Sequence, residues 1–101
     1  MSIREKTIDL KIETIVTMKN YLLLKMKKCD IAESYLNDFE NANIALIDRL
    51  SELKVQIIAS SFSQKIPDSF GEEAMNIFEA IDNLHQELFQ EASKAISSFK
   101  Q

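Results

Sequence analysis

The sequence contains very little of the residue types that cross-link or interrupt a fold. Its 101 residues include one cysteine, one glycine, one proline, one histidine and no tryptophan. The lone Cys29 excludes an intramolecular disulfide and is typical of a reduced intracellular thiol. Scarce glycine and proline imply few turns, which favours long helices over strands. A catalytic cysteine would need a histidine partner, and no recognised motif surrounds Cys29 or His85, so we expect no enzyme.

Long apolar runs are also absent. Charged residues occur throughout positions 1–28, and even the longest apolar runs are only a few residues, such as Leu22–Leu24. The pattern therefore indicates neither a secretion signal nor a membrane span. Hydrophobic residues make up 46% and charged residues 28% of the chain, as in ordinary globular proteins. We therefore expect residues 1–101 to form a single helical domain, soluble and cytoplasmic, without membrane insertion.

Three helices are predicted from helix-start patterns and apolar periodicity. A serine or aspartate three residues before a glutamate is a capping box, and it occurs at Ser2 with Glu5, Asp30 with Glu33, and Ser69 with Glu72. The helices are expected at about 3–28, 31–63 and 70–100, with the second connection over residues 64–68, which include Pro67. Short connections make neighbouring helices antiparallel, so the sequence predicts an all-α fold, an elongated antiparallel three-helix bundle.

The first boundary has neither glycine nor proline. The apolar row of the first helix, continued past Met26, meets polar residues, whereas the row beyond the boundary begins at Ile31. This jump in phase predicts a tight turn or a sharp kink, and argues against one straight helix of about 60 residues. The row before the jump is Ile8, Ile12, Ile15, Leu22 and Met26, widened by Val16, Leu23 and Leu24.

The stretch from Asn43 to Ser63 carries two apolar rows at helical spacing, more than one neighbour requires. We expect the row Leu46, Leu50, Leu53 and Ile57 to be the internal core. The second row, and a second row on the third helix, exceed what a three-helix core can bury. The predicted partner-binding residues are Val55, Ile58, Phe62, Phe78, Phe89 and Ile96. Whether Val55, Ile58 and Phe62 belong to the core or to an interface stays open at this point.

The net charge of −4 is unevenly distributed. Residues 1–29 hold seven Lys or Arg against three acids, while residues 30–63 and 64–101 each carry a net charge of −4. This asymmetry suggests electrostatic matching within the fold or across a dimer. Lys19, Lys25, Lys27 and Lys28 crowd the end of the first helix, but the acidic remainder would repel phosphate and no nucleic-acid motif is present, so we expect no nucleic-acid partner.

His85 is the one residue around which chemistry could be built. Glu79, Asp82 and His85 lie on successive helical turns and could offer metal ligands, but the Glu-x-x-His pairs of helical di-iron sites are missing. The Lys and Gly that usually follow a phosphotransfer histidine are missing too. We expect His85 at the edge of the core, between Phe78 and Phe89, and we predict no cofactor and no metal.

These observations favour a non-enzymatic protein–protein interaction module: a small acidic helical adaptor, chaperone or inhibitor of the immunity type. Its partner is expected to be another protein, whose identity the sequence does not give. The first alternative is a self-assembling structural homodimer, in which the surplus apolar face is buried against a second copy. A third hypothesis is a phosphotransfer or metal-binding helical domain centred on His85.

Overall fold

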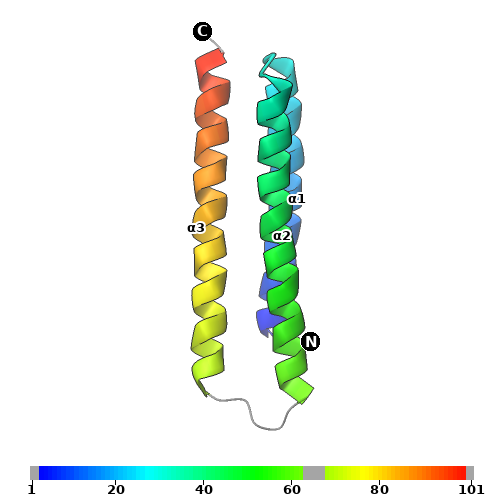
Figure 1. Cartoon of the computed structure of the whole chain (residues 1–101), viewed down its shortest axis with the longest axis vertical. Helices are drawn as coiled ribbons and strands as arrows, with labels where there is room; N and C mark the ends of the chain where they lie inside the picture. The colour runs from blue at the N-terminus through cyan, green and yellow to red at the C-terminus, as the bar shows by residue number, and fades with distance from the viewer. Residues whose placement is uncertain (1–2, 63–67, 100–101) are drawn as a thin grey trace.

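The protein is a rod of three long helices. The computed structural model describes the backbone of residues 3–62 and 68–99, with side chains over 6–59 and 73–98. The helices are α1 (Ile3–Lys28), α2 (Glu33–Phe62) and α3 (Asp68–Phe99). They run side by side and antiparallel in sequence order, in a body of 57 × 20 × 17 Å (Figure 1). The predicted elongated three-helix bundle is confirmed.

A tight turn joins α1 to α2. Asp30 has a φ of 56°, the left-handed conformation that aspartate tolerates better than most residues. The Ile31 amide donates to the Met26 carbonyl at 3.3 Å, and the Asp30 amide donates to the Lys27 carbonyl at 3.4 Å. These bonds and the buried pair Met26 and Ile31 form a Schellman motif, which ends a helix without glycine. The phase jump in the sequence is therefore a turn and not a kink.

Two of the predicted capping boxes are wrong. Asp30 closes the end of α1, and α2 begins only at Glu33, where the Tyr35 and Leu36 amides donate to the Ala32 carbonyl at 3.0 and 3.2 Å. Asp30 cannot cap α2 because the turn places it outside the first turn of that helix. α3 begins at Asp68, so Ser69 lies within the helix and not before it. Ser2 lies outside the described residues.

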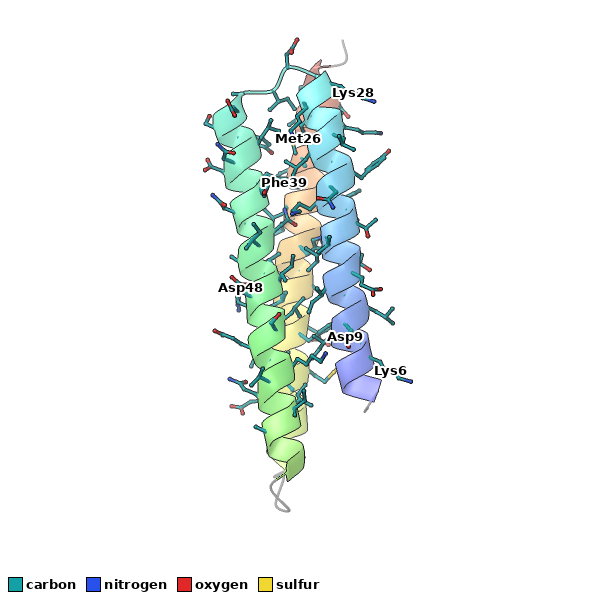
Figure 2. The ribbon with its side chains drawn as sticks, turned by 90° about the vertical axis from the view of Figure 1, so that its right-hand side faces the viewer. Lys6, Asp9, Met26, Lys28, Phe39 and Asp48 are labelled. Atoms are coloured by element: carbon teal, nitrogen blue, oxygen red, sulfur yellow. The ribbon has the colours of Figure 1, made fainter. Side chains whose placement is uncertain are left out.

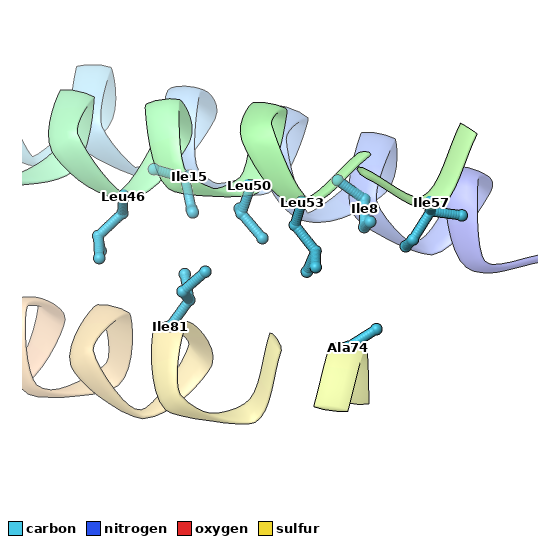
Figure 3. Packing of buried hydrophobic residues seen from close by; sticks show 8 residues of the cluster. All are labelled: Ile8, Ile15, Leu46, Leu50, Leu53, Ile57, Ala74 and Ile81. Atoms are coloured by element: carbon cyan, nitrogen blue, oxygen red, sulfur yellow. The ribbon is translucent and has the colours of Figure 1, made fainter. Parts of the chain in front are cut away.

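The core consists of two clusters along the rod. In the first, the expected row of α2 packs against both neighbouring helices, and all of its members are buried (Figure 3). Its buried residues are Ile8, Ile15, Leu46, Leu50, Leu53, Ile57, Ala74 and Ile81. The assignment of Leu46, Leu50, Leu53 and Ile57 to the internal core is confirmed.

The second cluster lies at the end of the rod that holds the α1–α2 turn. Its buried residues are Leu22, Leu23, Met26, Ile31, Leu36, Phe39, Ala92 and Ile96. Figure 2 shows Met26 and Phe39 directed into the bundle, whereas Lys6, Lys28 and Asp48 are directed away from it. Ile96 therefore contributes to the core, because the face of α3 that carries Ala92 and Ile96 is the one turned inward.

Candidate interaction surface and a buried histidine

The residues predicted to bind a partner do not form one surface. Val55 is exposed and Ile58 is half-buried on α2, but Ile96 is buried. Phe78 packs against the first core cluster and Phe89 against the second, so these two aromatic side chains are partly buried at different levels of the rod. The side chain of Phe62 lies outside the described residues. Ile96 therefore lies in the core and not on an exposed face, whereas partner binding by Val55, Ile58, Phe78 and Phe89 stays a prediction.

Two ion pairs show which side of each helix faces its neighbours. Lys54 of α2 donates to the Asp9 carboxylate of α1 at 2.7 Å. Lys11 of α1 pairs with Asp82 of α3. The Asp9 side of α1 therefore faces α2, and the Lys11 side faces α3. Leu10, between them in sequence but on the opposite side of the helix, is left facing away from the bundle.

An exposed row of α1 follows from this rotation, and we call it the outer α1 row. Its members alternate at spacings of four and three residues and are all exposed: Leu10, Thr14, Thr17, Tyr21, Leu24 and Lys28. The exposed fractions of Leu10, Tyr21 and Leu24 are 63%, 55% and 61%. Because the opposite face of α1 holds buried core residues, this helix is apolar on both its inner and its outer side.

Sequence reasoning missed the outer α1 row as a surface. It treated Leu24 as a widening of the buried face and assigned no role to Leu10. The four-and-three spacing was the signal that could have found the row. What the sequence lacked was the rotation of α1 about its axis, which the ion pairs to α2 and α3 reveal.

Three lysines lie at the second half of the outer α1 row: Lys25 and Lys27 flank it, and Lys28 is its last member. Within the part of the chain that the structure describes, Lys27 and Lys28 make no ion pair. The Lys25 ammonium lies 4.7 Å from the centroid of the Tyr21 ring, a cation–π contact within α1. The positive charge expected to match the acidic helices thus remains largely unpaired at this end of α1.

The side chain of His85 is buried in the bundle, with an exposed fraction of 4%, and not at its edge as expected. Its Nδ1 lies 3.1 Å from Nζ of Lys11, whose ammonium also pairs with Asp82. An ammonium can only donate, so Nδ1 is the acceptor and the neutral imidazole carries its proton on Nε2. Gln86 supports the network, because its Nε2 donates to Asp82 Oδ2 at 3.0 Å.

This network shifts two pKa values in the same direction for different reasons. Burial lowers the pKa of His85 below its ordinary value of 6.5, and the nearby Lys11 charge lowers it further, against the opposing effect of Asp82. The hydrogen bond from Lys11 holds the pKa of Asp82 below its ordinary value, although burial opposes it. At neutral pH the imidazole is therefore neutral and the Asp82 carboxylate is charged.

The arrangement around His85 is unsuited to the chemistry considered from sequence. The Lys11 ammonium contacts both the histidine and the aspartate. Among the described residues, no group of three or more His, Cys, Asp or Glu side chains is placed to hold a metal. A phosphotransfer histidine must present a ring nitrogen to a partner, whereas His85 is buried. Lys11 lies 74 residues away in the chain, so only the fold reveals this contact.

An apolar cleft of about 240 Å³ lies at the end of the rod where α1 begins. It lies between all three helices, and its lining is almost entirely apolar. The lining residues are Thr7, Ile8, Leu53, Ile57, Ala74, Met75 and Phe78. Among the described residues, the lining therefore offers shape and apolar surface, with the Thr7 hydroxyl as its one polar side-chain group.

None of the helices in the described ranges has the length and apolar character needed to cross a membrane.

Comparison with known proteins adds no relative: no protein-family model, no curated protein and no solved structure matches the chain.

Proposed function

We propose that the protein is a non-enzymatic interaction module, a rigid helical rod that binds another protein through its outer faces. Adaptor, chaperone and inhibitor roles all use such a module. The observation that carries the proposal is the exposure of large apolar side chains on helices whose inner faces already form the core. Leu10, Leu24 and Val55 are each more than 60% exposed, so water contacts most of the surface of these apolar side chains when the chain is alone.

The polar groups of the structure support the same proposal by their arrangement. Lys11, Asp82 and His85 bind each other in the bundle, so each of these three side chains is already engaged and not free for acid–base or nucleophilic work. The described residues that line the apolar cleft carry no charge. The hypothesis centred on His85 therefore has no observation in its favour, and we do not carry it further.

Affinity capture followed by reconstitution tests the proposal. The full chain is immobilised through a terminal tag and exposed to an extract of its native organism, and any captured protein is purified and titrated by calorimetry. We expect one protein to bind with a defined stoichiometry. Failure of every captured protein to bind in purified form would contradict the proposal.

Light scattering at several protein concentrations tests the alternative of a structural homodimer. An interaction module that awaits a different protein stays at the monomer mass of 11.6 kDa over the range measured. A stable mass of twice that value would favour the homodimer, because the apolar side chains would then be covered by a second copy.

A further inference from the structure

We infer that the outer α1 row is a docking seam for a single helix of the partner protein, and that this helix is amphipathic and acidic. The inference rests on the proposed interaction function and specifies its surface. It differs from the surface expected from sequence, which was centred on Val55 and Ile58 of α2.

The spacing of the row is the first argument for a helical partner. Steps of four, three, four, three and four residues keep the side chains on one line along the helix, as the seam of a coiled coil requires. The row extends for about 27 Å, close to half the length of the rod. A second helix laid along it could seat its own apolar side chains between Leu10, Tyr21 and Leu24.

Thr14 and Lys28 can be covered at low cost. The Thr14 hydroxyl already donates to the Leu10 carbonyl at 2.8 Å, so a partner need not supply its acceptor. Lys28 stands at the end of the row, where its charged group can stay in water while its methylene stem is covered. A partner helix that covers Thr14 therefore does not bury an unpaired hydroxyl donor at that residue.

The unpaired lysines determine the charge of the partner. Lys25 and Lys27 lie on opposite sides of the row, one residue from Leu24 and Lys28 respectively, which are the flanking positions that select a coiled-coil partner. Within the described part of the chain neither has a carboxylate partner. A helix with glutamate or aspartate beside its apolar residues would meet both cations, whereas a basic helix would be repelled.

The same charges exclude the α1 helix of a second copy as the occupant. Antiparallel pairing about Thr17 would bring Lys27 and Lys28 of one copy close to Lys6 of the other. Parallel pairing would place the two Lys28 side chains together on the seam. Like charges at these positions disfavour both arrangements, so charge complementarity selects a different, acidic helix.

A titration with a synthetic helix tests the inference. The probe is an acidic peptide of four heptads, with leucine and isoleucine on the seam and glutamate at the flanking positions. It is added to the isotope-labelled full chain, and amide chemical shifts are followed by NMR. We expect the largest shifts along the outer side of α1, from Leu10 to Lys28. A peptide with lysine in place of each glutamate should bind more weakly by a factor of at least about ten.

Two matched variants locate the surface. Leu24→Glu and Val55→Glu place the same new charge on side chains with exposed fractions of 61% and 64%. We expect Leu24→Glu to weaken peptide binding about ten-fold or more, and Val55→Glu to leave it unchanged. Both variants should keep the melting temperature of the parent, which shows that the loss is in binding and not in folding.

Several outcomes would overturn the seam. They are equal binding of the acidic and basic peptides, a loss with Val55→Glu equal to that with Leu24→Glu, and binding to vesicles of anionic phospholipid without binding to the peptide. A concentration-dependent dimer broken by Leu24→Glu would also overturn it, because the occupant would then be a second copy.

The natural partner separates failure of the seam from failure of the proposed function. If a captured protein binds Leu24→Glu as well as it binds the parent, the interaction function stands and the seam is wrong. If no captured protein binds the purified parent, the interaction function itself fails.

Discussion

Replacing Lys11 by methionine should destabilise the protein far more than its position on a partly exposed helix suggests. Methionine preserves most of the length and apolar volume of the lysine stem, so packing changes little. The substitution removes the ammonium that donates to Nδ1 of His85 and pairs with Asp82. The perturbation therefore isolates the polar network that joins α1 to α3.

The magnitude follows from the burial of each partner. His85 is 4% exposed, so leaving its Nδ1 without a donor costs about 1–3 kcal/mol. The Asp82 side chain is 33% exposed, and loss of its ion pair adds at most about 1 kcal/mol because water screens the charge. We expect the free energy of unfolding to fall by about 1–4 kcal/mol, and each kcal/mol corresponds to about 4–8 °C in melting temperature for a domain of this size.

Urea unfolding followed by circular dichroism at pH 7 measures this loss, with the slope against urea as a check that the unfolded state is unchanged. The control is Lys54→Met, which removes the other ion pair, between Lys54 and Asp9, whose side chains are 29% and 37% exposed. That variant should lose less than about 1 kcal/mol. Equal losses in the two variants would refute the argument, because the buried acceptor of His85 would then contribute nothing.

Three further changes test other parts of the structure. The His85 pKa is lowered in the native state, so the unfolded state binds more protons below pH 6.5. The free energy of unfolding measured in urea should therefore fall as pH drops from 6.5 toward 5, by at most about 1.4 kcal/mol per pH unit. His85→Gln should flatten that part of the pH profile. The Asp82 contribution is lost only at lower pH, as pH falls through its native pKa below 3.8. Asp30→Gly should raise the free energy of unfolding by about 0.5–1 kcal/mol, measured in urea, because glycine adopts the φ of 56° without a Cβ penalty. Ile96→Ala should lower the same quantity by about 2–4 kcal/mol, whereas Val55→Ala should change it by less than about 0.5 kcal/mol, as expected for a core and a surface residue.

Local periodicity predicted the fold because helices are specified by neighbouring residues. The Leu46, Leu50, Leu53 and Ile57 row repeats at a spacing that only one helix face satisfies, and all four residues are buried. The phase jump before Ile31 likewise located the turn without glycine or proline. The bundle followed from three such segments and two short connections.

The role of Asp30 could not be read from its neighbours. An aspartate three residues before a glutamate suits a helix start, but the same aspartate also tolerates the positive φ that ends a helix. The hydrogen bonds of Asp30 and Ile31 to the end of α1 decided between the two roles. Each role satisfies local rules, so only the path of the chain distinguishes them.

The candidate site was harder to predict because it depends on how each helix is rotated about its axis. The second apolar row of α3 was expected to be outside, yet Ile96 is buried, and the polar His85 that interrupts this row is buried with it. His85 can lie inside only as a neutral ring accepting from Lys11, a contact across 74 residues of sequence. The outer α1 row was hidden for the same reason, since α1 is apolar on both sides.

The distribution of charge over the three helices takes on a different meaning once these rotations are known. The surplus of lysine on α1 and of acids on α2 and α3 suggested matching inside the fold. Among the described residues, the ion pairs between helices are Lys11 with Asp82 and Lys54 with Asp9, and each contributes little by itself. Lys25 and Lys27 remain beside the exposed outer α1 row, and Lys28 is its last member. These unpaired charges support the acidic helix that we propose as the partner of α1, and they add no ion pair to the described part of the bundle.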